Sequence, residues 1–263
     1  MIASELLARL VAEAGSEMHD RRQRRPAAEL EREVGALPPP RDFAAALREA
    51  GLSVVAEMKA RTPSAGVLAE DYRPGRLARA YTEGGAAALS VLTQGASFGG
   101  RLEHLGEARA ASPLPVLRKD FLTEEYQVLE ARAAGADAVL LIVAVLRPRR
   151  LNQLLAGARG LGLEALVEVH DERELEEALL AGARVLGVNH RDLATFSLDL
   201  GLTERLAPLV PPGTLLVAES GIRDAADARR VWAAGANAVL VGEALMRAPD
   251  PAARIRELRV NSA

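Results

Sequence analysis

The chain has 263 residues, 49% of them hydrophobic, and a formal net charge of −3, which suits one large α/β domain and argues against nucleic-acid binding by bulk electrostatics. It contains no cysteine, which excludes disulfides, thiolate metal sites and cysteine nucleophiles. Its four histidines have neither H-x-x-x-H nor H-x-H spacing, so we expect no metal site.

The apolar runs are too short to cross a membrane. The longest, residues 138–146, falls well below the roughly 20 residues that a spanning helix needs, and it suits a buried strand. Residues 1–20 carry charged side chains among apolar positions at helical spacing, which predicts an amphipathic helix and not a signal peptide. We therefore expect a cytoplasmic protein with no membrane partner.

Residues 1–48 are expected to form a helical extension in front of the main domain. The pattern predicts a long helix that ends before Pro26, a second short helix, a stop at Pro38–Pro40 and a helix over Asp42–Ala50. The arginine-rich run 21–25 is interpreted as a solvated helix end, because the rest of the chain offers no basic face for nucleic acid. Such an extension can lie against the main domain and help to frame the mouth of a site.

One pattern recurs along the chain: a helix end closed by glycine, followed at once by a short apolar strand. It occurs at residues 83–92, 134–142, 181–188 and 234–242. The intervening segments complete a set of eight candidate strands: Ser53–Met58, Ala87–Leu92, Pro115–Arg118, Ala138–Val143, Glu164–Val169, Val185–Val188, Thr214–Ala218 and Ala238–Val241. Eight alternating βα units are typical of a (β/α)8 barrel, which we expect over residues 49–263.

The predicted helix starts and the residues after the first strand give further support to the barrel. Thr123, Asp171 and Asp224 are predicted N-caps of the helices that follow them. A doubly wound open sheet is the alternative architecture, and it usually has a glycine-rich phosphate turn after its first strand. Here that position reads Glu57-Met-Lys-Ala-Arg-Thr62, which favours the barrel.

Lysine occurs only twice, as Lys59 and Lys119, among 33 basic residues. Arginine supplies charge equally well but keeps its proton, whereas burial can tune a lysine into an acid, a base or a Schiff-base nucleophile. Both lysines end predicted strands, where the active sites of barrels lie. The alternatives are chance retention of surface lysines, or a structural Glu–Lys network that only closes the barrel top.

Further polar residues are predicted at the same end of the barrel. Glu57 shares a strand face with Lys59, and Glu168 ends an otherwise apolar strand, where an unpaired charge would be costly. Asn189 follows the sixth strand, and Arg191 comes two residues later. We expect these side chains to converge with the lysines.

The seventh and eighth strands end in glycine turns, at Glu219-Ser220-Gly221 and at Gly242-Glu243. Backbone N–H groups in such turns can face an anion, because glycine allows close approach. These two strands usually carry the phosphate site of a barrel, so a phosphorylated ligand is expected here.

Read together, six motifs closely resemble the indole-3-glycerol phosphate synthase family of tryptophan biosynthesis: Glu57-x-Lys59-x-x-Thr-Pro-Ser64, Leu117-Arg-Lys-Asp-Phe121, Leu166-Val-Glu-Val-His170, Gly187-Val-Asn-His-Arg-Asp-Leu193, Ala218-Glu-Ser-Gly-Ile222 and Val241-Gly-Glu-Ala-Leu-Met246. The resemblance covers nearly the whole chain, including the extension with its Pro-Pro-Arg-Asp-Phe43 segment. The chain departs from the family at Thr62, His190 and Asp192, where the family usually has Ser, Asn and Asn.

The resemblance implies a ring closure without a cofactor. The substrate that it implies is 1-(2-carboxyphenylamino)-1-deoxyribulose 5-phosphate, which would lose carbon dioxide and water to give the indole product. The resemblance implies that Lys119 is the acid that protonates the ketone oxygen. Lys59 and Glu168 are expected to be the acid and base of the dehydration, without an individual assignment, and Glu57 and Glu219 to orient and charge-balance the lysines.

The resemblance also implies the groups that hold the substrate. Asn189 is expected to hydrogen-bond it, and Arg191 to pair with its carboxylate or orient a catalytic group. The phosphate is expected to contact the backbone of Ser220, Gly221, Gly242 and Glu243, together with Thr62 or Ser64. The anthranilate ring is expected to pack on Phe98, Phe121 and Leu140, although Leu140 suits the core equally well.

Two other functions remain open at this point. One is an aldolase-type barrel in which Lys119 or Lys59 forms a Schiff base, and the other is a barrel that binds a phosphorylated ligand without turnover. The expected partner is a phosphorylated small molecule, with no nucleic acid. We expect a monomer or a weak homodimer.

Overall fold

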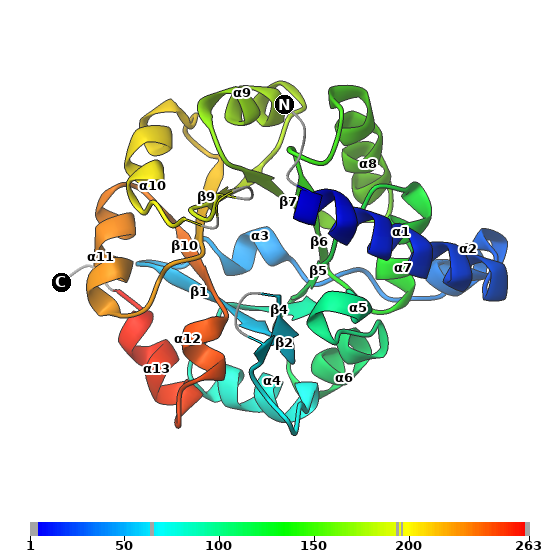
Figure 1. Cartoon of the computed structure of the whole chain (residues 1–263), viewed down its shortest axis with the longest axis horizontal. Coiled ribbons are helices and arrows are strands. Elements are labelled where there is room, and N and C mark those ends of the chain that lie inside the picture. Colours follow the sequence, from blue (N-terminus) through cyan, green and yellow to red (C-terminus); the bar gives the residue numbers. More distant parts are fainter. Residues whose placement is uncertain (1–4, 64–65, 193–194, 196, 261–263) are drawn as a thin grey trace.

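The computed structural model describes residues 5–63, 66–192, 195 and 197–260, and its centre is a closed barrel of eight parallel strands (Figure 1). The strands run around the barrel in the order β1, β10, β9, β8, β7, β6, β5, β4. Their bounds are β1 Ser53–Met58, β4 Ala88–Leu92, β5 Val116–Lys119, β6 Ala138–Ile142, β7 Glu164–Val169, β8 Val185–Asn189, β9 Leu215–Glu219 and β10 Ala238–Val241. The predicted barrel is confirmed, and each strand lies within one residue of its predicted bounds.

Helices surround the strands and alternate with them in sequence (Figure 1). The outer helices are α4 Pro74–Glu83, α6 Glu103–Ala111, α7 Glu125–Ala133, α8 Pro148–Gly160, α9 Glu172–Leu180, α10 Gly201–Leu206, α11 Ala225–Ala233 and α13 Pro251–Leu258. Short elements lie in the loops: β2 Arg61–Thr62, β3 Gly66–Val67, α5 Gly95–Phe98, the 3-10 turn Ala207–Leu209 and α12 Glu243–Met246. None of the helices in the described ranges has both the length and the hydropathy that a membrane span requires.

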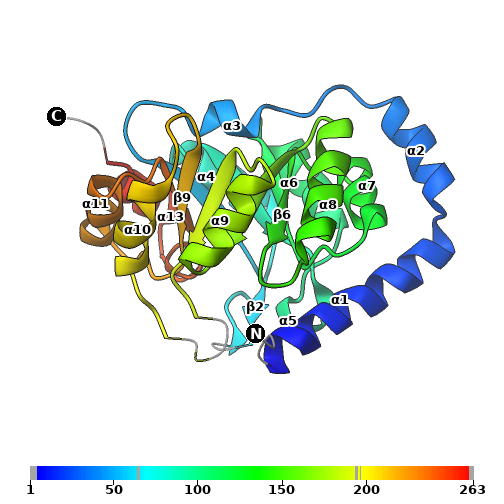
Figure 2. The same cartoon turned by 90° about the horizontal axis from the view of Figure 1, so that it is seen from above.

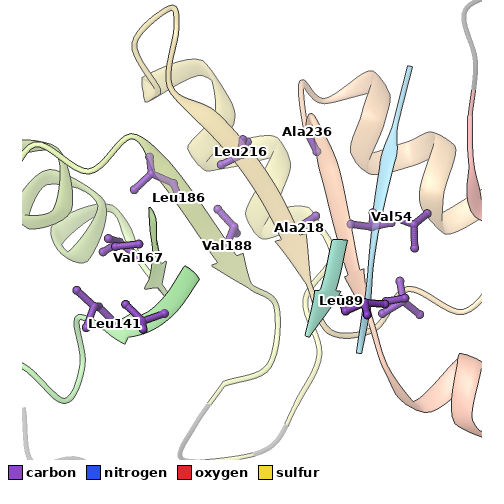
Figure 3. Close-up of a cluster of buried hydrophobic side chains, with 14 of the residues drawn as sticks. Val54, Leu89, Leu141, Val167, Leu186, Val188, Leu216, Ala218 and Ala236 are labelled. Carbon is purple, nitrogen blue, oxygen red and sulfur yellow. The ribbon is translucent and has the colours of Figure 1, made fainter. Parts of the chain in front are cut away.

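The strands bury both of their faces, which produces two separate apolar layers. Residues such as Val54, Leu89 and Leu141 point outward to the helices and form the larger core cluster (Figure 3). Residues such as Val55 and Leu117 point inward and fill the barrel. Side chains along a strand alternate between its two faces. Since Val55 of β1 points inward, Glu57, two residues later on the same strand, also points into the barrel.

Two of the three predicted helix caps are confirmed. Asp171 accepts a hydrogen bond from the backbone N–H of the third residue of α9, and Asp224 caps α11 in the same way. The prediction for Thr123 is wrong, because Glu124 is the N-cap of α7. The side chain of Gln127 reaches back and accepts from the N–H groups of Thr123 and Glu124, at 2.8 and 3.0 Å, so the threonine hydroxyl is not needed.

The N-terminal extension forms α1 Glu5–Arg24, α2 Ala27–Gly35 and α3 Phe43–Ala46. The helix predicted over residues 42–50 is shorter than expected, since the chain leaves it in turns that lead to Gly51, whose φ is 91°. Phe43 of α3 is fully buried in the interior layer of the barrel. Figure 2 shows α3 and α1 at opposite ends of the barrel, so the extension covers both.

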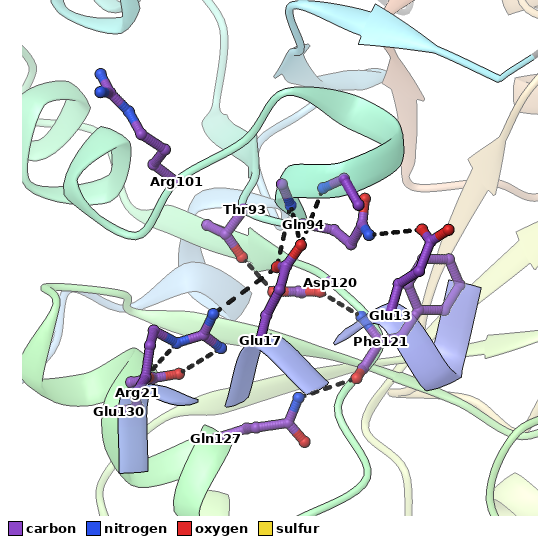
Figure 4. Close-up of polar contacts among 12 residues, drawn as sticks. Glu13, Glu17, Arg21, Thr93, Gln94, Arg101, Asp120, Phe121, Gln127 and Glu130 are labelled. Atoms are coloured by element: carbon purple, nitrogen blue, oxygen red, sulfur yellow. Dashed lines mark hydrogen bonds and ion pairs between the residues drawn. The ribbon is translucent and has the colours of Figure 1, made fainter. Parts of the chain in front are cut away.

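A buried ionic network joins α1 to the barrel (Figure 4). Arg118 of β5 is fully buried and donates hydrogen bonds to Glu130 and Asp120, each at 3.0 Å. Arg21 of α1 donates to the same Glu130 at 2.6 and 3.1 Å. The sequence predicted that the arginine-rich run 21–25 is a solvated helix end, and this is true only in part. Arg21 is half-buried and paired with Glu130, whereas the other arginines of the run are exposed.

A second contact fixes α1 to the loop after β4. The Glu17 carboxylate accepts hydrogen bonds from the backbone N–H groups of Gly95 and Ala96, at 2.9 to 3.2 Å. Glu13 accepts from Gln94 and from Ser97. The long helix is thus attached along its length at the end of the barrel where the strands finish.

We predict that Glu130→Ala lowers the free energy of unfolding by about 3–5 kcal/mol, because it leaves the buried Arg118 with one partner fewer. Denaturant unfolding measures this change. Glu125→Ala on the same helix removes an exposed carboxylate and is the matched control, with an expected change within about 0.5 kcal/mol. Equal small effects of the two substitutions would show that the network does not stabilise the fold.

Candidate active site

A cavity of about 610 Å³ opens at the carboxyl ends of the barrel strands. It brings together almost all the predicted residues: Glu57, Lys59, Thr62, Phe98, Lys119, Phe121, Leu140, Glu168, Asn189, Arg191, Glu219, Ser220, Gly221, Gly242 and Glu243 all line it. Ser64 lies outside the described residues. Three leucines of α1, Leu6, Leu7 and Leu10, complete the wall, and the sequence did not single them out.

Lys119 lies between two carboxylates from neighbouring parts of the barrel. Its Nζ is 3.1 Å from Glu168 Oε2 and 3.3 Å from Glu219 Oε2. Burial lowers the pKa of Lys119, but the attraction of Glu168, Glu219 and Glu57 outweighs burial and raises the pKa above its usual value. Lys119 is therefore a cation that can donate a proton when a stronger base is brought to it.

The two carboxylates beside Lys119 differ in their tendency to ionise. Burial acts against ionisation of Glu168, but Lys119, His170 and the amide of Asn189 at 3.1 Å favour the charged form and lower its pKa. Burial raises the pKa of Glu219 to about 8, with Lys119 opposing and the charge of Glu168 adding to the rise. Neighbouring groups with pKa values driven apart can act as acid and base at the same pH.

The second lysine has its own partner at the end of β1. Lys59 Nζ forms an ion pair with Glu57 Oε1, and the Glu57 side chain is 4% exposed. The predicted sharing of one strand face is thereby confirmed. Lys59 and Lys119 line one cavity from different strands, which rules out the interpretation that both are scattered surface residues.

Two glycines provide the space that the buried carboxylates occupy. A Cβ atom on Gly187 of β8 would lie 2.0 Å from Glu219 Oε1, and one on Gly242 would lie 2.3 Å from Glu57 Oε1. Each distance is far shorter than a van der Waals contact, so a side chain at either position would force the neighbouring carboxylate to move. From the sequence, Gly242 was predicted to contact the phosphate, and Gly187 was given no functional role.

The turn after β9 has an unusual backbone. Ser220 has a φ of 65°, and it is the one non-glycine residue in the described part of the chain with positive φ. Gly221 follows with a φ of 78°. A left-handed serine is uncommon, and such conformations cluster at functional sites. Thr62 and the start of α12 line the same cavity.

The side of the cavity towards β4 and β5 is apolar. The rings of Phe98 and Phe121 have centroids 6.4 Å apart, with 40° between their planes. Leu140 is 2% exposed and belongs both to the cavity wall and to the inner core layer. An apolar wall opposite glycine turns suits a ligand with an aromatic end and an anionic end.

Two histidines near the site have different roles in the structure. His190, at one of the departures from the family, is buried away from the cavity and contacts Ser220 O at 2.8 Å and Thr203 Oγ1 at 2.6 Å. Burial lowers its pKa, so it supports the Ser220 turn as a neutral ring. His170, the residue directly after β7, was not predicted near the site, although continuing the strand alternation from Glu168 by two residues would place both side chains on one face.

The chain matches the family model described as indole-3-glycerol phosphate synthase over residues 7–258. It is 62% identical over 255 residues to "Indole-3-glycerol phosphate synthase 2" of Streptomyces coelicolor, covering 97% of this chain and 99% of that protein. It is 47% identical to "Indole-3-glycerol phosphate synthase" of Dehalococcoides mccartyi, covering 96% and 99%. Among solved structures, a thiamine phosphate pyrophosphorylase from Pyrococcus furiosus shares the fold, with a TM-score of 0.59, 21% identity and coverage of 79% and 93%.

The closed barrel, with lysine–carboxylate pairs in a cavity at the carboxyl ends of its strands, has the architecture of a (β/α)8-barrel enzyme. Full-length matches at high identity make the assignment more specific. The chain belongs to the indole-3-glycerol phosphate synthase family.

We predict that Gly187→Ala lowers kcat/KM by about 100-fold, because the added methyl group displaces the Glu219 carboxylate from Lys119. Steady-state kinetics with the family's substrate measures this loss. Gly157→Ala in α8 is the matched control, since a Cβ there meets nothing within 4 Å. The control is expected to keep full activity and to be up to about 1 kcal/mol more stable. Full activity of Gly187→Ala would contradict the proposed steric constraint.

Proposed function

We propose that the cavity binds 1-(2-carboxyphenylamino)-1-deoxyribulose 5-phosphate and converts it to indole-3-glycerol phosphate. The observation that carries this proposal is the position of Lys119, a buried cation 3.1 Å from Glu168 and 3.3 Å from Glu219 in the cavity. The membership of the chain in the family supports it. The reaction is a carboxy-lyase step of tryptophan biosynthesis that needs no cofactor.

The residues divide the proton transfers between them. In the ring closure, the aromatic carbon that bears the carboxylate attacks the ketone carbon, and Lys119 protonates the ketone oxygen. The carboxylate then leaves as carbon dioxide, and its electron pair restores the aromatic ring. In the dehydration, Lys59 protonates the departing hydroxyl group while Glu168 removes the proton from the neighbouring carbon.

The proton balance agrees with the arrangement of these groups. Two protons leave the acids and one returns to the base, so each turnover takes up one proton from solvent. Glu168 lies 3.1 Å from Lys119 Nζ, so the proton that it removes can pass directly to the lysine. Glu57 holds Lys59 through an ion pair, and Glu219, whose pKa is raised to about 8, lies 3.3 Å from Lys119 and helps to position it.

The two ends of the cavity match the two ends of the substrate. Phe98, Phe121 and Leu140 would pack against the anthranilate ring. Asn189 would hydrogen-bond the substrate and Arg191 would pair with its carboxylate. The phosphate would contact Thr62, Ser64, Ser220, Gly221, Gly242 and Glu243, with the glycines as backbone donors. We further propose that the protein is cytoplasmic and a monomer or weak homodimer.

The charge state of Lys119 argues against the Schiff-base alternative. A lysine nucleophile needs a lowered pKa so that its amine is neutral, whereas the carboxylates raise the pKa of Lys119. A barrel that only binds a ligand has no need of two lysines and three glutamates around one cavity. The acid–base proposal accounts for these residues.

Supplying the carboxyphenylamino substrate and following indole fluorescence tests the proposed activity directly. We expect fluorescence to rise with release of one carbon dioxide per indole formed. Borohydride added with the substrate should leave both lysines unmodified, whereas a Schiff-base enzyme would be trapped. Folded protein that binds the substrate but forms no indole would contradict the proposal.

We predict that Lys119→Arg loses about 10²- to 10⁴-fold in kcat and changes KM little. Arginine preserves the charge and the ion pairs, but among the same carboxylates its delocalised guanidinium holds its proton more tightly than the ammonium group of lysine does. Steady-state kinetics separates the two parameters, and titration with the product shows whether binding survives. A kcat like that of the unmodified protein would remove Lys119 from the role of acid.

A further inference from the structure

His170, directly after β7, connects the site to the first turn of α9. Its Nε2 is 3.3 Å from Glu168 Oε1, and its Nδ1 is 3.0 Å from Glu174 Oε2. Its backbone N–H also donates to the Glu174 carboxylate at 2.9 Å. The imidazole therefore lies between two carboxylates, one of which faces Lys119.

This geometry determines the charge of the imidazole. A neutral ring donates from one nitrogen only, and its other nitrogen would place a lone pair against a carboxylate. Nδ1 makes a hydrogen bond with Glu174, and Nε2 lies at ion-pair distance from Glu168 without hydrogen-bond alignment, so the two carboxylates favour the imidazolium mainly through their charge. Burial would lower the pKa of His170, but contacts with Glu168 and Glu174 outweigh burial and raise its pKa to about 10.

We propose that His170 and Glu174 form a positioning pair for the catalytic base, in which a fixed imidazolium keeps Glu168 ionised and holds its Oε1 in place. The inference rests on the proposed function, because it assigns His170 through the role of Glu168. Glu174 is 5% exposed and anchors the ring from the helix side. His170 does not line the cavity, so it acts through Glu168 and not on the substrate.

The other polar and charged groups around Glu168 and Glu174 do not take the place of His170 as the cation beside Glu168 Oε1. On the β5 side, Lys119 contacts Glu168 Oε2, the oxygen that His170 does not face. On β8, the neutral Asn189 donates to Oε1 at 3.1 Å and adds no charge. Arg173 lies 3.7 Å from Glu174 Oε1, on the far side of the pair. When Lys119 gives its proton to the substrate, His170 is the cation that still faces Glu168.

The decisive variant is His170→Gln, which fills similar space without charge. We expect KM to change less than about 2-fold and kcat to change little at pH 7, where Glu168 stays ionised. We expect the acidic limb of the kcat profile to move up by about one pH unit, because Glu168 becomes easier to protonate. The loss of activity should therefore be confined to the acidic side of the profile and vanish as the pH rises.

A merely structural role would lower activity equally at every pH, and that result would overturn the proposal, as would an unchanged acidic limb. Glu174→Gln should move the limb in the same direction by a smaller amount. Glu172→Gln, in the same turn of α9, removes an exposed carboxylate that does not contact His170 and is the matched control. Its profile should match that of the unmodified protein.

NMR titration of the His170 ring tests the pair without turnover and without a variant. We expect the ring to stay doubly protonated from pH 5.5 to 8.5, and titration near the ordinary value of about 6.5 would overturn the proposal. Failure of the proposed function would appear separately, as absence of indole product from the unmodified protein. Active protein with an ordinary His170 titration would leave the function standing and remove the positioning pair.

Discussion

The structure depends on one constraint: the charges at the top of the barrel leave bulk water and must therefore balance one another. An unpaired ion in such a place would cost several kcal/mol. Lys59 pairs with Glu57, and Lys119 lies between Glu168 and Glu219. Burial raises the pKa of Glu219, and the charge of the neighbouring Glu168 adds to the rise, whereas Lys119 and His170 keep Glu168 ionised. Two neighbouring carboxylates thus differ in charge.

The rest of the molecule holds this arrangement in place. Fully buried Arg118 precedes Lys119 on β5 and is tied through Glu130 to α1, so the long N-terminal helix is attached to the strand that carries the lysine. The same helix contributes leucines to the cavity wall. At the opposite end, Phe43 of α3 fills the barrel interior. The extension thus closes the barrel below and shapes its site above.

Sequence reasoning succeeded where the signal is local and periodic. The strands are short apolar runs bounded by glycine turns, and alternation placed Glu57 and Lys59 on one face. It failed where a competing local contact decided the outcome, as when Gln127 replaced Thr123 in ordering the start of α7. It also missed Gly187, His170 and the α1 leucines. Their importance depends on which side chain a neighbouring element presents, and no periodicity encodes that.

The sequence by itself determined the barrel, the order of its strands along the chain and the residues at their carboxyl ends, because these follow from hydrophobic periodicity and turn chemistry. Only the tertiary structure decided which carboxylate meets which lysine and which of them keeps its proton. A pKa is set by burial and by charges within a few ångströms, and at this site those charges come from strands far apart in the chain. The sequence therefore predicted which residues line the cavity, and the closed barrel determined how they pair.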